Sequence, residues 1–166
     1  MTNSEYVIDT SSLIEVQKHV IPLGKLFEPI LEQMGLMCKN RQLIAPEQVR
    51  KELHLLPNPD RFGNWVRSNS TMFLKTTNFH IRIVTKIMQK HSNWIAVSKS
   101  GEWADPFVIA LALGNSSRSL TIKTIITDET KTKDTHIPAI AKEYNIECLS
   151  LAEFLNQEFS MTLEKR

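Results

Sequence analysis

The chain has 166 residues, a formal net charge of +2 and a pI near 8.6, which suits one domain with a real core over residues 1–166. Its two cysteines lie in no C-x-x-C pair, so they suggest neither a disulfide framework nor a thiolate zinc site. We see no signal peptide and no run of the roughly 18–20 apolar residues that span a bilayer, so we expect a soluble, cytoplasmic protein without membrane partners.

Short β-prone runs alternate with helical spacing in the first half of the chain. In chain order, we expect a strand at 6–8, a helix from Leu13 that stops at Pro22, a helix up to about Asn40, an extended piece at 42–45 and a helix opened by Pro46. The residues after the first strand, Asp9 to Ser12, carry the side-chain oxygens that favour a helix start.

The second half continues the alternation. We expect helices at 60–68 and 78–90 with a possible strand at 72–74 between them, a loop at 93–104, an apolar helix from Asp105 that ends at Gly114, strands at 124–127 and 146–149, and helices at 137–144 and 151–159. Strands that alternate with helices of this length imply parallel pairing with right-handed crossovers. The fold class is therefore α/β, a three-layer α/β/α sandwich with a mostly parallel central sheet.

Acidic residues stand at the edges of several apolar segments. Asp9 and the pair Asp128-Glu129 directly follow predicted strands, and the carboxyl ends of parallel strands gather ligands at one edge of a sheet. Glu52 falls on the margin of an apolar helical stripe, where an unpaired carboxylate is costly. Asp105 opens a helix that is apolar on every side, so its start should face a protected hollow.

Each acid also has a purely structural interpretation. Asp9 and Asp105 could cap helices, although Ser12 and Glu15 have the spacing of a capping box that would leave Asp9 free for another role. Glu52 could belong to a structural ion pair, and Asp128 and Glu129 could be turn residues. If the acids instead meet in the fold, the natural reason is a divalent cation, and hydrolysis of a nucleic-acid phosphodiester is the expected chemistry.

The sequence lacks the motifs of zinc hydrolases and of nucleotide-binding proteins. The five histidines show neither H-x-x-x-H nor H-E-x-x-H spacing, which disfavours a zinc hydrolase, and no P-loop or G-x-G-x-x-G pattern occurs. Lysines and arginines recur along the chain and could form a basic surface around the acids, although most solvate helix faces. Trp65, Trp94 and Trp103 could stack on bases, but tryptophans are more often part of a core.

Four segments, in order along nearly the whole chain, resemble those of PIN-domain proteins. They are Val7-Ile8-Asp9-Thr10-Ser11, Val49-Arg50-Lys51-Glu52-Leu53, Ala104-Asp105-Pro106-Phe107-Val108-Ile109-Ala110-Leu111-Ala112 and Ile125-Ile126-Thr127-Asp128-Glu129. Each motif alone is weak, whereas the ordered set is fairly specific. The closest likeness is to an uncharacterised PIN-like subfamily of the kind encoded beside regulatory partners in toxin–antitoxin pairs.

The resemblance implies a ribonuclease that depends on Mg²⁺ or Mn²⁺, with Asp9, Glu52 and Asp105 as metal ligands and catalytic residues and Ser11 orienting them. The usual fourth acid lies two residues after the threonine, which favours Glu129 over Asp128 as the remaining ligand. It also implies an RNA substrate, an antitoxin encoded nearby and a homodimer.

Three alternatives remain open. The first is a non-catalytic PIN-like module that binds RNA or a protein, and the second is a nuclease directed at DNA. The third, a phosphatase of the haloacid-dehalogenase kind, would want a second aspartate at position 11, where this chain has Ser11.

Overall fold

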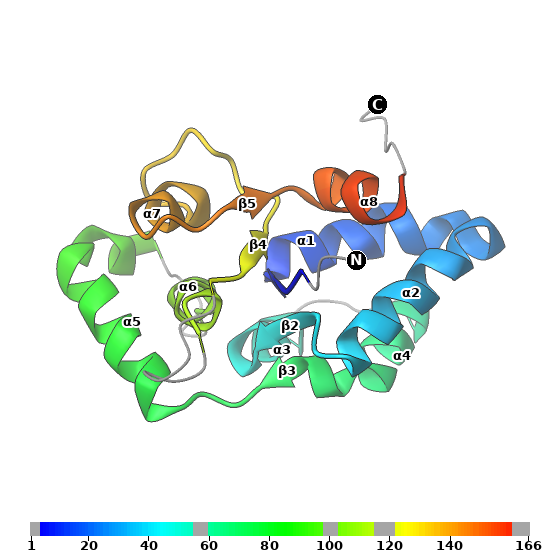
Figure 1. The fold of residues 1–166 in the computed structure, drawn as a ribbon, viewed down its shortest axis with the longest axis horizontal. Coiled ribbons are helices and arrows are strands. Elements are labelled where there is room, and N and C mark those ends of the chain that lie inside the picture. The colour runs from blue at the N-terminus through cyan, green and yellow to red at the C-terminus, as the bar shows by residue number, and fades with distance from the viewer. Residues whose placement is uncertain (1–3, 55–59, 98–102, 115–121, 161–166) are drawn as a thin grey trace.

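The computed structural model describes residues 4–54, 60–97, 103–114 and 122–160. Its centre is a five-stranded parallel sheet with the strand order β3-β2-β1-β4-β5 (Figure 1). In chain order the strands are β1 Tyr6–Ile8, β2 Leu43–Pro46, β3 Phe73–Leu74, β4 Thr124–Ile126 and β5 Cys148–Leu149. β1 pairs with both β2 and β4, so the residues that follow β1 lie in the middle of the sheet edge.

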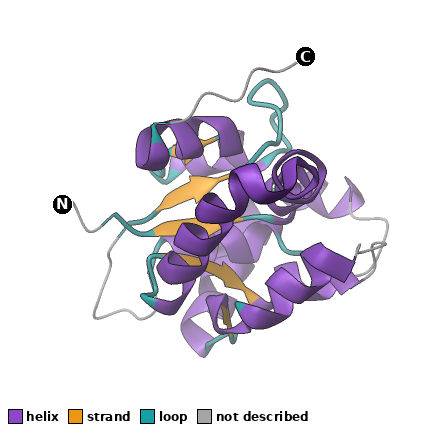
Figure 2. Cartoon of the chain, turned by 90° about the vertical axis from the view of Figure 1, so that its right-hand side faces the viewer, coloured by secondary structure: helices purple, strands orange, loops and turns teal. Residues whose placement is uncertain are grey.

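Helices lie on both faces of this sheet (Figure 2), which confirms the predicted α/β/α sandwich. In chain order they are α1 Thr10–Glu15, the π-helix η1 Val16–Val20, the 3₁₀ helix η2 Ile21–Phe27, α2 Glu28–Lys39, α3 Glu47–His54, α4 Asp60–Ser68, the 3₁₀ helix η3 Ser70–Met72, α5 Asn78–Lys90, the 3₁₀ helix η4 Ser92–Val97, α6 Asp105–Ala112, α7 Ile137–Glu143 and α8 Leu151–Phe159.

The centre of the core is formed by β1 and α6. All residues of β1 are buried, and α6 packs against β1, β2 and β4 while α5 and α7 pack against α6. A helix with neighbours on so many sides has no polar face to offer to water, which explains why α6 is apolar all round. Because α6 is held in the core, the position of its first residue, Asp105, is fixed relative to the strand ends.

Pro22 does not stop the first helix, as we expected it to. The helical path continues from α1 through η1 into η2, and Pro22 stands in the first turn of η2. Proline lacks an N–H donor, but the first turn of a helix needs none, so the residue fits there. The break comes instead at Gly24, which has a φ of 60° inside η2.

Smaller differences concern the ends of elements. The 3₁₀ helix η4, Ser92–Val97, covers the start of the segment 93–104 that we predicted as a loop, while 98–102 lie outside the described residues. The predicted strand 124–127 ends at Ile126, and β5 begins at Cys148 rather than at Ile146. Of the helices in the described ranges, none combines the length and the apolar character needed to cross a membrane.

Candidate active site at the carboxyl end of the sheet

Asp9 is the innermost acid of the site. It directly follows β1, its residue is 3% exposed, and its backbone N–H donates to Ile126 of β4 at 3.1 Å. Its carboxylate also caps α1, accepting a hydrogen bond from the Ser12 N–H at 2.9 Å. The expected capping box at Ser12 is therefore wrong: Ser12 is buried inside the helix, and Asp9 itself is the cap.

Two hydroxyl groups complete the surroundings of the Asp9 carboxylate. The Ser11 hydroxyl lies 2.9 Å from both carboxylate oxygens, and Thr127 Oγ1 donates to Oδ2 at 2.7 Å. Ser11 thus holds the Asp9 carboxylate by hydrogen bonds, while the role in a metal site that the resemblance implied for it stays a prediction. Thr127 comes from the end of the neighbouring strand and was not among the predicted residues. Burial raises the pKa of Asp9 to about 7, although these hydrogen bonds oppose the effect.

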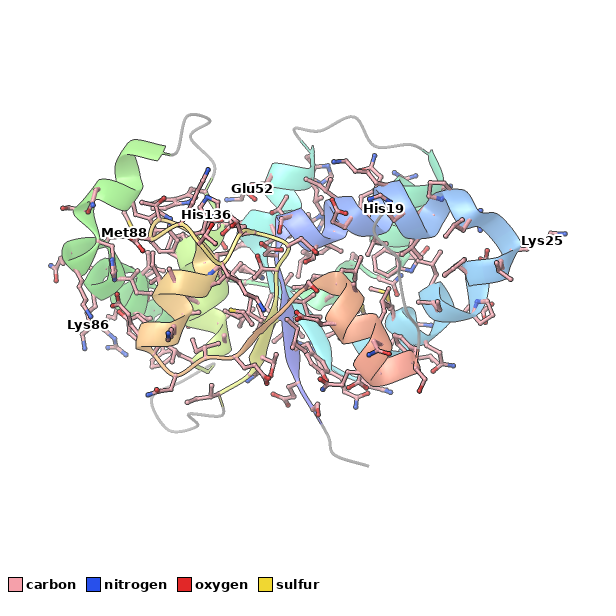
Figure 3. The ribbon with its side chains drawn as sticks, turned by 90° about the horizontal axis from the view of Figure 1, so that it is seen from above. His19, Lys25, Glu52, Lys86, Met88 and His136 are labelled. Atoms are coloured by element: carbon pink, nitrogen blue, oxygen red, sulfur yellow. The ribbon has the colours of Figure 1, made fainter. Side chains whose placement is uncertain are left out.

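Glu52 joins the starts of two helices that are distant in sequence. Its carboxylate accepts hydrogen bonds from the Thr10 hydroxyl and, at 2.8 Å, from the backbone N–H of Ala104. Thr10 begins α1, and Ala104 immediately precedes α6. The margin position of Glu52 on α3 therefore directs its side chain toward the beginning of α6, where Asp105 lies. Figure 3 shows Glu52 toward the middle of the molecule.

Asp105 is not a helix cap. Ala104 occupies the N-cap position of α6, and no side chain of the described residues caps this helix start by a hydrogen bond. The Trp103 side chain forms a hydrogen bond with the Asp105 carboxylate, and His136, labelled beside Glu52 in Figure 3, is electrostatically coupled to it. Burial raises the pKa of Asp105 despite both influences. The capping interpretation fails because the helix begins one residue earlier than the sequence suggested.

The adjacent acids Asp128 and Glu129 have different partners. Asp128 Oδ2 accepts hydrogen bonds from the buried Ser12 hydroxyl at 2.6 Å and from the Leu151 N–H at 3.1 Å, so it ties α1 to the start of α8. Glu129 Oε2 accepts from the Ile137 N–H at 2.7 Å, at the first turn of α7. Asp128 therefore has a structural role, whereas Glu129 lies with the other acids.

Mutual repulsion shows that the acids share one electrostatic environment. The pKa of Glu129 is raised to about 8, first by burial and then by the negative charges of Asp105, Asp9 and Glu52. The charge of Asp105 likewise raises the pKa of Asp9. We call Asp9, Glu52, Asp105 and Glu129 the acidic cluster. Residues that are far apart in sequence thus lie close enough to disfavour each other's ionisation.

The acidic cluster does not form a finished metal cage. Among the residues that the structure describes, no group of three His, Cys, Asp or Glu side chains is arranged to hold one ion. The acids repel one another without being close enough to share an ion, because electrostatic repulsion acts over longer distances than coordination bonds. The carboxylates therefore lie in the same part of the molecule, but Glu52 and Glu129 are each held by a different backbone N–H group.

The chemistry of the donor set still fits a hard cation. Carboxylate and hydroxyl oxygens are the ligands that Mg²⁺ and Mn²⁺ prefer. Ser11, Ser12 and Thr127 supply three hydrogens to the Asp9 carboxylate, which has about four acceptor positions, so one position is left for a cation. A positive ion would also relieve the repulsion that raises the pKa of Glu129.

Glu129→Gln tests whether burial and the neighbouring acids raise the pKa of Glu129 in the folded protein. Because the folded protein holds the Glu129 proton more tightly than the unfolded chain, unfolding releases protons between about pH 4.5 and pH 8, and stability falls as the pH rises through this window. The glutamine carries no charge but can still accept from Ile137. In urea unfolding with a chelator present, we expect the variant to gain stability over the wild type progressively from pH 5 to pH 8.5.

A matched control is Glu147→Gln, which removes an exposed carboxylate outside the cluster and should leave the pH dependence of the wild type unchanged. A stability difference between Glu129→Gln and the wild type that stays constant over this pH range would contradict the raised pKa of Glu129.

Comparison with known proteins places the chain in a family defined by sequence. The model of the family described as a domain of unknown function, DUF4411, matches residues 6–162, which include every residue of the acidic cluster. No curated protein and no solved structure matches the chain. Since the match extends over nearly the whole chain, the protein belongs to the DUF4411 family.

Proposed function

We propose that this protein is an endoribonuclease that hydrolyses RNA phosphodiester bonds with the help of Mg²⁺ or Mn²⁺. The observation that carries the proposal is the acidic cluster, in which Glu129 is electrostatically coupled to Asp105, Asp9 and Glu52 at the carboxyl end of a parallel sheet. Burying like charges together is costly unless a cation offsets them, so a function that uses the cation is the natural reason to keep them. The ordered resemblance to PIN-domain segments supports the same activity.

Asp9, Glu52, Asp105 and Glu129 would hold the ion, which would supply charge neutralisation at the scissile phosphate and a more acidic water. The protein itself holds the carboxylates in position. Ser11 and Thr127 hold the Asp9 carboxylate in one orientation, and the N–H groups of Ala104 and Ile137 hold Glu52 and Glu129. A preorganised set of oxygens does not need to rearrange at the moment of reaction.

Asp9→Asn and Asp105→Asn should each lower metal-dependent cleavage of single-stranded RNA by about 100-fold or more, because each removes one negative oxygen from the cluster. Cleavage of end-labelled RNA on gels measures the rate, and circular dichroism confirms that the variants fold. Single-stranded DNA of the same sequence, tested in parallel, separates a ribonuclease from a DNA-directed nuclease.

Asp134→Asn is the matched control, since it removes an exposed carboxylate near α7 and should leave cleavage at the wild-type rate. Undiminished cleavage by carefully purified Asp9→Asn protein would reject the catalytic assignment.

A non-catalytic module that binds RNA or a protein is the second candidate. It is favoured by the protein donors that already engage Glu52 and Glu129, and by the absence of a three-ligand arrangement within the described ranges. In that case Glu52 would tie α3 to the starts of α1 and α6, Glu129 would tie the segment after β4 to the start of α7, and neither would bind an ion.

Calorimetric titration with Mn²⁺ distinguishes the two candidates. For the enzyme we expect saturable binding that weakens at least about tenfold in Asp9→Asn and persists in Asp128→Asn, because Ser12 and Leu151 already use the Asp128 carboxylate. A wild-type protein that binds no Mn²⁺ at millimolar concentration would favour the module.

We also propose that the ribonuclease is the toxin of a toxin–antitoxin pair, a role supported by the resemblance alone. Expression of the wild-type chain should then arrest bacterial growth, and the product of the neighbouring gene should relieve the arrest. Asp9→Asn should not be toxic at equal protein level. Normal growth during strong expression of the active enzyme would oppose this role.

A further inference from the structure

A pocket of about 350 Å³ lies beside the acidic cluster, between α3, α5 and α6. This volume falls within the range of about 300–1,000 Å³ that is typical of small-molecule sites. Pro106, which follows Asp105, lines it, and so does Lys51, which precedes Glu52. The other side chains that matter here are Val84, Met88, Trp103 and Phe107.

Trp103 is held in place from two sides. Its indole N–H donates a hydrogen bond to the Asp105 carboxylate, and its ring meets the buried Trp94 edge to face, with the ring centroids 5.0 Å apart. The next residue, Ala104, is fixed as well, because its backbone N–H donates to Glu52 at 2.8 Å. A half-buried side chain that is already fixed loses little conformational entropy when a ligand binds to it. Trp103 is therefore a preorganised wall of the pocket.

The remaining walls suit a flat ligand with apolar faces. Val84 and Met88 of α5 and Phe107 of α6 supply half-buried apolar surface opposite and beside the indole. Figure 3 shows Met88 on α5 and Glu52 on α3, the two helices that flank the pocket together with α6. Nucleobases are ligands of this shape, and they stack on aromatic side chains with little dependence on the identity of the base.

Charge favours a nucleotide over an uncharged aromatic ligand. Among the described residues that line the pocket, Lys51 alone carries a charge, and its exposed ammonium can contact a phosphate. A base stacked on Trp103 would lie next to Asp105, to which the indole is bonded, and near Glu52, which holds the following N–H group. The phosphate of that nucleotide would therefore be within reach of the acidic cluster.

We propose that this pocket is a stacking subsite for the nucleobase next to the cleaved phosphodiester, with Trp103 as the stacking surface and Lys51 as the phosphate contact. The identity of the ligand rests on the proposed ribonuclease function. Every base has a face that can stack, so the subsite accepts all four bases. It favours single-stranded RNA, because the bases of a duplex are not free to leave their neighbours.

Binding of the four ribonucleoside monophosphates and of ribose 5-phosphate, measured by calorimetry with a chelator present, tests the proposal without any turnover. All five ligands carry the same sugar phosphate, so repulsion by the acids affects them alike and only the base differs. We expect each nucleotide to bind at least about fivefold more tightly than ribose 5-phosphate, because stacking adds to the affinity. The affinities of the four nucleotides should lie within about tenfold of one another.

Trp103→Phe and Trp103→Leu form a matched pair, because both lose the N–H that binds Asp105 but only phenylalanine can stack. The phenylalanine variant should keep most of the preference for nucleotides over ribose 5-phosphate, whereas the leucine variant should reduce it to less than about twofold. Lys51→Ala should weaken binding of the nucleotides and of ribose 5-phosphate by a similar factor. Circular dichroism confirms that each variant folds.

Arg50→Ala is the control for Lys51→Ala, because Arg50 is exposed on the same helix and is not among the residues that line the pocket; it should leave all affinities unchanged. Ribose 5-phosphate that binds as tightly as the nucleotides, no binding of any nucleotide, or equal nucleotide binding by the phenylalanine and leucine variants would each overturn the proposal. The first two outcomes require no variant. Since no cleavage is measured, a protein without nuclease activity can still confirm the subsite, and an active nuclease without base-dependent binding refutes the subsite alone.

Discussion

The repulsion among one buried and three half-buried carboxylates at one edge of the sheet is the constraint on which the rest of the site depends. Asp9, Asp105 and Glu129 are all harder to ionise than in water because burial removes their hydration, and Glu129 also feels the charges of its neighbours. A fold tolerates such an arrangement only where many donors hold the acids. The hydroxyls of Ser11 and Thr127 and the N–H groups at three helix starts supply those donors.

The fold places these donors by simple means. β1 and β4 are adjacent and parallel, with Ile8 paired to Ile126, so the residues after them face each other across the sheet edge. α6 is apolar on every side and held in the core, which fixes Asp105 near that edge. The pocket between α3, α5 and α6 is a by-product of the same packing, since the helices that carry Glu52 and Asp105 also form its walls.

The parts of the fold that were predictable from sequence are those governed by local patterns. β1, α5 and α8 follow from apolar runs and spacing, and the order of the acids points to one edge of a parallel sheet. The caps were not predictable, because a shift of one residue decides whether Asp105 is the cap or the first helical residue. The bonds from Thr127 to Asp9 and from Thr10 to Glu52 join distant segments, and a sequence pattern carries no record of such pairings.

The contrast between Asp128 and Glu129 has a consequence for how this segment can evolve. Neighbouring residues after β4 serve two unrelated tasks, since one fastens α1 to α8 and the other joins the acidic cluster. Point substitutions can change either task separately, but insertion or deletion of a single residue between Ile126 and Asp128 would shift both acids by one position and damage both tasks at once. The length of this short connection should therefore be under stronger selection than the chemical identity of either acid.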